Sequence, residues 1–254
     1  MQLRIYALSD LHIDYDENRR WLANLSLEDY RDDVLILAGD ISDITRYLTL
    51  SFSELKKRFR MVLFVPGNHD LWTYRNKVQN SLIYFDLIKK IARENGILTE
   101  PASIGKISII PLYGWYDYSF GFPGDELSSI WRDYFACSWP ENFNEQTITR
   151  HFVAMNERYL TIRNDYVISF SHFMPRIDIM PSIIPQNKRI LYPVLGTVLL
   201  EEQIRRLRPS IHIYGHTHVN MKVQREGIVY INNAFGYPEE TRIAKKELSI
   251  VFEN

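Results

Sequence analysis

Short apolar runs recur along the chain and are separated by polar segments. They occupy residues 3–8, 34–38, 61–65, 107–112, 166–171 and 211–214. Apolar runs of this length that end in loops predict buried β-strands. Segments with helical spacing lie between the first runs, and this alternation of strands and helices predicts an α/β fold.

Two of the expected helices have clear boundary signals. Residues 79–95 carry an apolar stripe and are followed by Gly96, which is typical of a helix end. Asn144 is placed to cap the start of a second helix, because its short side chain can accept a backbone hydrogen bond. His151 falls inside this second helix, where a structural role is expected.

The second half of the chain has a different pattern. Residues 219–233 read as two strands around a turn at Glu226 and Gly227, and residues 247–254 supply a further strand. A mixed sheet, or two sheets, follows from this pattern. His212 lies inside the strand at 211–214, where it is expected to be an ordinary buried histidine.

The chain is expected to form one domain over residues 1–254, because no repeat, low-complexity tract or long linker divides it. Residues 113–165 interrupt the rhythm of strands and read as an inserted cap. Eleven aromatic residues lie between Tyr113 and Phe143 in this segment. The segment is therefore a candidate for the rim of a binding site.

Composition narrows the classes of function. The chain has 254 residues, 46% of them hydrophobic, and its 30 basic side chains balance 31 acidic ones. This balance disfavours a long nucleic acid, which normally requires a basic track. The single cysteine, Cys137, and the absence of a leader or an apolar membrane-length segment favour a cytoplasmic protein with no membrane role.

Polar side chains of metal-ligand type follow five of the expected strands. The first strand leads to Asp10 and His12, whose side chains point the same way because they are two residues apart in extended chain. The other strands end at Asp40, at Asn68, His69 and Asp70, at His172, and at His216 and His218. Helix capping is the alternative explanation for Asp40 or Asn68 taken singly. Together the residues at the five strand ends predict one crevice at the carboxyl ends of the strands.

The glycines before these polar residues support a shared crevice. Gly39, Gly67 and Gly215 each directly precede one of them, and glycine permits the sharp turn or close backbone approach that such a site needs.

The ordered series SDLH, GD, GNHD, SH and GHTH resembles the calcineurin-like metallophosphoesterase superfamily, and it spans residues 9–218. The resemblance implies a four-layer α-β-β-α sandwich with two mixed sheets and a two-metal site at the strand ends. It also implies the ligands: one metal is held by Asp10, His12, Asp40 and His218, and the other by Asp40, Asn68, His172 and His216.

The chemistry of these side chains agrees with the implied roles. A carboxylate such as Asp40 can bridge two cations that lie about 3.5–4 Å apart. Imidazole nitrogens mixed with oxygens suit manganese, iron or zinc more than calcium. By the same resemblance His69 contacts the phosphate and protonates the leaving oxygen, with Asp70 orienting it, while the two cations activate water and stabilise the developing charge.

The resemblance points to the phosphodiesterase-like branch and to a small phosphorylated or nucleotide-type substrate. Protein Ser/Thr phosphatases of the superfamily carry an arginine in the second motif, in the form GDxVDRG, but this chain has Ile44 and Thr45 there. A protein phosphatase, a nuclease and a catalytically silent protein-binding scaffold stay open as alternatives. The presence of His69 and of all the implied ligands favours catalysis over the scaffold.

Three further residues are candidates for substrate contacts. Arg176 follows His172 by four residues and can offer a planar donor to a phosphate, although a surface salt bridge explains it equally well. Trp115 and Tyr116 follow the strand at 107–112 and can stack on a flat group. Packing within the cap is the alternative for both rings.

Overall fold

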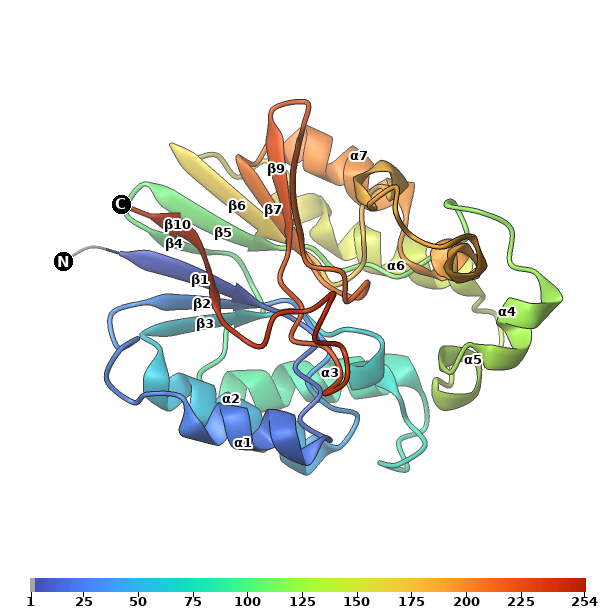
Figure 1. The fold of residues 1–254 in the computed structure, drawn as a ribbon, viewed down its shortest axis with the longest axis horizontal. Helices are drawn as coiled ribbons and strands as arrows, with labels where there is room; N and C mark the ends of the chain where they lie inside the picture. The colour runs from blue at the N-terminus through green and yellow to red at the C-terminus, as the bar shows by residue number, and fades with distance from the viewer. Residues whose placement is uncertain (1–2) are drawn as a thin grey trace.

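The computed structural model describes residues 3–254, which form two β-sheets packed between helices (Figure 1). Residues 1–2 of the expected domain lie outside the described part. The first sheet has the strand order β10-β1-β2-β3. Its strands are β1 (Arg4–Leu8), β2 (Val34–Leu37), β3 (Met61–Phe64) and β10 (Ser249–Glu253). Strands β1, β2 and β3 are parallel, and β10 pairs with β1 in the antiparallel direction.

The second sheet has the strand order β4-β5-β6-β7-β9-β8. Its strands are β4 (Ala102–Ile104), β5 (Ile107–Pro111), β6 (Tyr166–Phe170), β7 (Ile211–Tyr214), β8 (Met221–Arg225) and β9 (Ile228–Asn232). The four inner strands are parallel, and β4 and β8 are antiparallel edges. Both sheets are mixed, which confirms the expected fold class.

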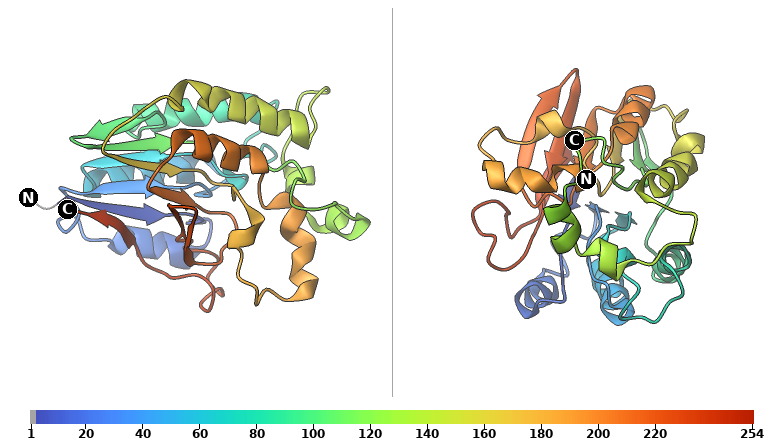
Figure 2. Two further views of the ribbon diagram at one scale, coloured as in Figure 1. Left: turned by 90° about the horizontal axis from the view of Figure 1, so that it is seen from above. Right: turned by 90° about the vertical axis from the view of Figure 1, so that its right-hand side faces the viewer.

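Helices cover the outer faces of the two sheets. Those beside the first sheet are α1 (Asp16–Asn24), α2 (Thr45–Arg58) and α3 (Ser81–Glu94), and those beside the second are α6 (Glu145–Asn156) and α7 (Val198–Leu207) (Figures 1 and 2). Two short helices, α4 (Asp125–Ile130) and α5 (Asp133–Ala136), project at the end opposite the termini. Single turns or 3₁₀ segments are η1 (His69–Leu71), η2 (Glu157–Tyr159), η3 (Ile177–Ile179) and η4 (Gln186–Val194).

The boundary signals read from the sequence are confirmed. Helix α3 begins after Asn80, whose side chain accepts from the backbone of Ile83, and Gly96 follows it with a positive φ of 71°. Helix α6 begins after Asn144, which forms a reciprocal capping box with Thr147. Such caps satisfy backbone N–H groups that the helix itself leaves unpaired.

The hydrophobic core fills the space between the sheets and under the helices. All four residues of β2 and all five of β5 are buried. The two sheets are joined at the carboxyl ends of β1 and β9, where Ser9 N donates to Asn233 O and Phe235 N donates to Ser9 O. Because these loops are tied together, the polar residues that follow the strands of both sheets are held in one place.

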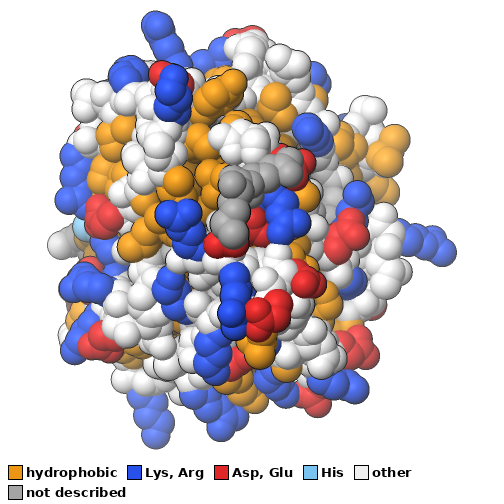
Figure 3. All heavy atoms as spheres, turned by 90° about the vertical axis from the view of Figure 1, so that its left-hand side faces the viewer, with side chains coloured by type: hydrophobic (Ala, Val, Ile, Leu, Met, Phe, Trp, Pro, Cys, Tyr) orange, Lys and Arg blue, Asp and Glu red, His pale blue; other side chains and the backbone are white. Residues whose placement is uncertain are grey.

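The surface carries no large field of one sign on the face near the termini. Figure 3 shows blue and red side chains interspersed over this face, in keeping with the formal net charge of −1. Within residues 3–254, none of the helices is both long enough and apolar enough to cross a membrane.

Candidate metal centre

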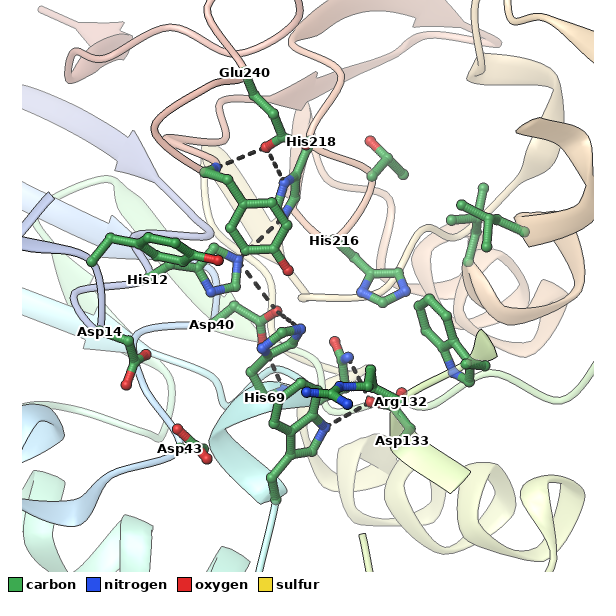
Figure 4. A pocket seen from close by; sticks show the side chains of 18 of the residues that line it. His12, Asp14, Asp40, Asp43, His69, Arg132, Asp133, His216, His218 and Glu240 are labelled. Atoms are coloured by element: carbon green, nitrogen blue, oxygen red, sulfur yellow. Dashed lines mark hydrogen bonds and ion pairs between the residues drawn. The ribbon is translucent and has the colours of Figure 1, made fainter. Parts of the chain in front are cut away.

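The loops after β1, β2, β3, β6 and β7 meet at one edge of the two sheets. They bring together all seven side chains that the sequence analysis assigned to metals, and each of these residues is at most 9% exposed. The residues are Asp10, His12, Asp40, Asn68, His172, His216 and His218. Figure 4 shows several of them around a cavity, with Asp40 between the histidines.

The first group of ligand atoms surrounds His218 Nε2. Asp10 Oδ1 lies 3.3 Å from this nitrogen and His12 Nε2 lies 3.2 Å from it. His12 Nε2 is also 3.9 Å from Asp40 Oδ2. The three side chains Asp10, His12 and His218 therefore present one atom each to a common point that a metal ion can occupy.

The second group surrounds His172 Nε2. This nitrogen lies 3.0 Å from Asn68 Oδ1, 3.2 Å from His216 Nδ1 and 3.5 Å from Asp40 Oδ1. Asp40 thus directs one carboxylate oxygen at each group. This is the arrangement that a carboxylate shared by two cations requires.

Hydrogen bonds on the far side of three imidazole rings fix which nitrogen faces the centre. His172 Nδ1 donates to Ala38 O (2.8 Å), His216 Nε2 donates to Val194 O (3.0 Å) and His218 Nδ1 donates to Glu240 Oε2 (2.6 Å). In the neutral rings the remaining nitrogens are lone-pair acceptors. The Nε2 atom of His172 faces other acceptors, namely Asn68 Oδ1, Asp40 Oδ1 and His216 Nδ1, so a cation between them turns a repulsive arrangement into a bound one.

Burial favours the neutral form of most of these rings. It lowers the pKa of His12 and His172, and it lowers the pKa of His216 to about 3. Burial acts in the same direction on His218, but the Asp10 and Glu240 carboxylates outweigh it and raise the pKa of His218 to about 9. For Asp40, burial and the charges of neighbouring carboxylates raise the pKa well above its usual value.

Five of the seven candidate ligands have a left-handed backbone. The φ angles are between 41° and 68° at Asp10, His12, Asp40, His216 and His218. This region is unfavourable for residues with a side chain, and such strain concentrates at functional sites.

Two glycines allow the close packing of the loops under this site. A Cβ atom at Gly39, which has φ of +88°, would lie 2.5 Å from His172 Nδ1, and one at Gly67 would collide with Asp40 Oδ1. Only glycine leaves this space free, so the close backbone approach expected at these two positions is present.

His69 lies at the edge of the centre and is its most accessible histidine. Its side chain is 22% exposed, and Nε2 is 3.9 Å from Asp40 Oδ2. The ring stacks on Trp72 with centroids 3.8 Å apart, and the backbone N–H donates to Asp40 Oδ1 (2.9 Å). A histidine in this position can reach a substrate that occupies the cavity.

Asp70 occupies a different place from the one expected. Its Oδ2 accepts from the backbone N–H groups of Asp40 and Gly67, and its Oδ1 accepts from those of Ile41 and Ser42. No hydrogen bond in the described part of the chain joins Asp70 to the His69 ring. The carboxylate instead ties the loop after β2 to the loop after β3.

The centre opens into a cavity of about 650 Å³. Several residues that line it could not be predicted from the sequence, because they lie outside the motifs. They are Asp14, Asp43, Arg75, Ile130, Trp131, Arg132, Asp133, Leu191, Leu195, Tyr237 and Glu240. The aromatic segment at 113–143 was the only sequence feature that indicated some of these residues. The rings predicted from it to contact substrate were Trp115 and Tyr116, whereas the ring that lines the cavity is that of Trp131.

The three candidate substrate contacts do not line the cavity. Trp115 and Tyr116 are each 1% exposed and pack within the core, where Trp115 meets Phe173 at 5.0 Å between centroids. Arg176 lies beside a separate surface pocket, where it pairs with Asp178, Glu201 and Glu226. These contacts favour the packing and salt-bridge alternatives.

The sequence of the chain is similar to that of one known protein family. The family model for calcineurin-like phosphoesterases matches residues 3–220. A Mycobacterium tuberculosis protein, the [acyl-carrier-protein] phosphodiesterase PptH, is 26% identical over 95% of this chain and 80% of its own length. An uncharacterized protein, L509, from Acanthamoeba polyphaga mimivirus is 25% identical over 92% of this chain and 91% of its own length.

The fold has a counterpart among solved structures. The crystal structure of the phosphopantetheinyl hydrolase PptH from M. tuberculosis superposes with a TM-score of 0.80 at 23% identity, covering 99% of this chain and 96% of the other. At this sequence identity the superposition is evidence for the fold alone. Evidence for the chemistry of the centre comes from the side chains of this chain that surround it.

Proposed function

The chain belongs to the calcineurin-like phosphoesterase family, and from this premise we propose that it cleaves the phosphodiester that joins a phosphopantetheinyl group to a carrier protein. The broader activity follows from the family: the protein is a dinuclear metal-dependent hydrolase of phosphoester bonds. The narrower substrate is our proposal.

One observation carries this choice of substrate: the similarity to the acyl-carrier-protein phosphodiesterase extends over 95% of the chain, including the segment outside the ligand motifs. The lining of the cavity supports it. Around the metal centre the cavity wall carries more acidic than basic side chains, and its two arginines are Arg75 and Arg132. Ile130, Trp131 and Leu191 add apolar groups to the wall. Such a wall suits an ester with one phosphate and an uncharged arm better than a polyanion.

The proposal assigns the two metal positions as the motifs imply. One would be held by Asp10, His12, Asp40 and His218, and the other by Asp40, Asn68, His172 and His216. When bound, two cations at these positions lower the pKa of water and neutralise charge on the phosphoryl group. Their identity is proposed as manganese, iron or zinc, because the donors mix imidazole nitrogen with oxygen.

The chain's own residues supply orientation and a proton. Asp40 is fixed by the backbone of His69, so both of its oxygens keep their directions. His69 projects into the cavity and is proposed to donate its proton to the leaving oxygen, which in this substrate belongs to the carrier protein. Asp70 is proposed to act on His69 only through the loop that it holds in place.

We also propose a single-domain organisation and a cytoplasmic location, as expected from the sequence. Residues 1–254 would form one metallophosphoesterase domain with residues 113–165 as an insertion. A single cysteine and a substrate attached to a carrier protein are consistent with a cytoplasmic enzyme.

The test is a direct assay on a carrier protein that bears the phosphopantetheinyl group. Protein loaded with manganese should convert it to the unmodified carrier, as read by intact-protein mass spectrometry, and Asp40→Asn should abolish the conversion. Cyclic nucleotides, oligonucleotides, a phosphopeptide and an aryl phosphodiester serve as competing substrates. Hydrolysis of one of these biological substrates without conversion of the carrier would overturn the proposed substrate but leave the phosphoesterase activity intact.

A further inference from the structure

We propose that two carboxylates outside the ligand motifs, Asp133 and Glu240, are positioning residues that each set the affinity of a different metal position. Asp133 comes from the aromatic segment, and Glu240 lies in the loop after β9, beyond the region matched by the family model. The inference rests on the ligand set given under the proposed function, and it adds the groups that orient two of those ligands.

Asp133 determines the direction of the Asn68 amide. Its Oδ1 accepts from Asn68 Nδ2 (2.9 Å) and from Trp72 Nε1 (2.7 Å), and the residue is only 3% exposed. This leaves Asn68 Oδ1 directed at His172 Nε2, 3.0 Å away. Figure 4 shows the Asp133 carboxylate beside the cavity with both hydrogen bonds drawn.

Without Asp133, nothing that the structure shows would hold the amide in this direction. Rotation by half a turn would bring the NH₂ group to the His172 lone pair, where it could donate a hydrogen bond in the absence of metal. The second metal would then have to break this hydrogen bond before it could bind. Asp133 removes that competing state, because the carboxylate accepts only from the NH₂ end.

Glu240 plays the same part for the first position. Its Oε2 accepts from His218 Nδ1 (2.6 Å) and from the backbone N–H of Tyr237 (2.8 Å). This contact fixes the direction of the ring, so that Nε2 faces Asp10 Oδ1 at 3.3 Å. In the absence of Glu240, no hydrogen bond in the described part of the chain would hold Nδ1, and the ring could turn away from the direction in which Nε2 faces the first position.

The two devices are separate in the structure. In the described part of the chain, the only metal ligand that donates a hydrogen bond to Asp133 is Asn68, of the second position, and the only one that donates to Glu240 is His218, of the first. Groups that orient a metal ligand typically change metal affinity 10- to 100-fold. Two independent effects of this size should therefore be separable by a titration that observes each position on its own.

The experiment is a zinc titration of metal-free protein followed by the ring resonances of its histidines. Signals of His172 and His216 report the second position, and those of His12 and His218 report the first, with assignments from single His→Gln variants. In Asp133→Ala the zinc concentration needed to shift the signals of the second position should rise roughly 10- to 100-fold. The zinc concentration needed to shift the signals of the first position should stay within about threefold of the parent value. Glu240→Ala should give the reverse pattern.

Conservative variants and matched controls separate orientation from simple damage. Asp133→Asn and Glu240→Gln keep an oxygen acceptor and should restore most of the affinity. Asp125→Asn, on the exposed start of α4, and Glu239→Gln, next to Glu240 and exposed, should behave like the parent. If Asp133→Ala does not fold, Asp133→Leu replaces it, because leucine has a similar shape and accepts no hydrogen bond.

A second signature is independent of zinc. In metal-free Glu240→Ala, the ¹⁵N shift of His218 Nδ1 should change, because this nitrogen no longer donates to a carboxylate. The inference is overturned if each variant weakens both positions equally, or if neither variant weakens any position while the parent binds two zinc ions. A parent protein that binds no zinc would instead overturn the ligand set itself, and the inference with it.

Discussion

Individual histidines in this protein are distinguished by the partner of the nitrogen that faces away from the centre. His172 and His216 donate to main-chain carbonyls, His218 donates to a carboxylate, and each leaves its other nitrogen for a cation. His69 has no such partner among its described hydrogen bonds and stacks on Trp72 instead. His12 likewise shows no hydrogen bond at its other ring nitrogen in the described part of the chain, so what distinguishes His69 is its exposure, 22% of the side chain against 2% for His12.

Replacement of His69 by alanine should therefore affect rate and not metal content. We expect His69→Ala to retain both metals by element analysis and to lose about 10²- to 10⁴-fold in rate, as for removal of a general acid. The loss should be smaller for an aryl phosphodiester, whose leaving group needs no proton. Equal losses on good and poor leaving groups would exclude the role of acid.

His212 provides a pH prediction away from the centre. It is fully buried between Ser169 and Ser171, and burial lowers its pKa to about 3 from a usual value of 6.5. Below pH 6.5 the unfolded chain takes up a proton that the folded chain refuses, so stability is complete above 6.5 and falls toward pH 3. The unfolding free energy should fall by about 1.4 kcal/mol per pH unit from this residue.

Denaturant unfolding between pH 7 and pH 5 measures this effect. The parent should lose stability more steeply than His212→Gln, which cannot take up the proton. Parallel curves for the two proteins would show that His212 does not contribute to the pH dependence.

At the scale of whole elements, the strands were more predictable than the segment 113–165. Apolar runs that end in Asp40, His172 or His216 carry both the strand and its ligand in a few adjacent residues, so local sequence suffices. The rim of the cavity depends on how α4 packs against η4, which is a tertiary property. The aromatic segment therefore indicated an insertion, but not that Trp131 would line the cavity while Trp115 joined the core.

Residues 113–165 include both core residues and residues that line the cavity, so two substitutions in this segment should have different outcomes. Trp115→Ala should remove a buried ring at a cost of about 3–5 kcal/mol and impair all substrates in proportion to folded protein. Ile130→Ala, at a residue 51% exposed that lines the cavity, should leave the melting temperature nearly unchanged. It should raise KM for the carrier substrate about 4-fold for each CH₂ contact with the substrate that is lost, since one buried CH₂ is worth ~0.8 kcal/mol. Kinetics and thermal unfolding on both variants test this, and a substrate-selective defect in Trp115→Ala would contradict it.

At the scale of the whole molecule, the centre depends on both sheets. Asp10, Asp40 and Asn68 follow strands of the first sheet, whereas His172, His216 and His218 follow strands of the second. Ligands that are brought together only by folding bind metal in the folded chain and not in the unfolded one. Metal binding and global stability are then linked.

Removal of the metals should therefore lower stability as well as activity. Treatment with a chelator should abolish hydrolysis and lower the melting temperature by several degrees, since binding at 100 times Kd contributes about 2.7 kcal/mol per site. Calorimetry before and after addition of manganese measures this. Asp40→Asn, which has lost the shared carboxylate, should show almost no difference between the two conditions.

The left-handed backbone at five candidate ligands has an evolutionary consequence. Such positions cost of order 1–3 kcal/mol and persist only where the surrounding structure holds them in place, and Asp and His bear this cost better than most residues. A descendant of this chain that no longer needs catalysis would be free to relax these positions to glycine or asparagine, which tolerate the same φ at lower cost. Glycine or asparagine at positions 10, 12, 40, 216 and 218 would then mark family members that have abandoned chemistry for binding.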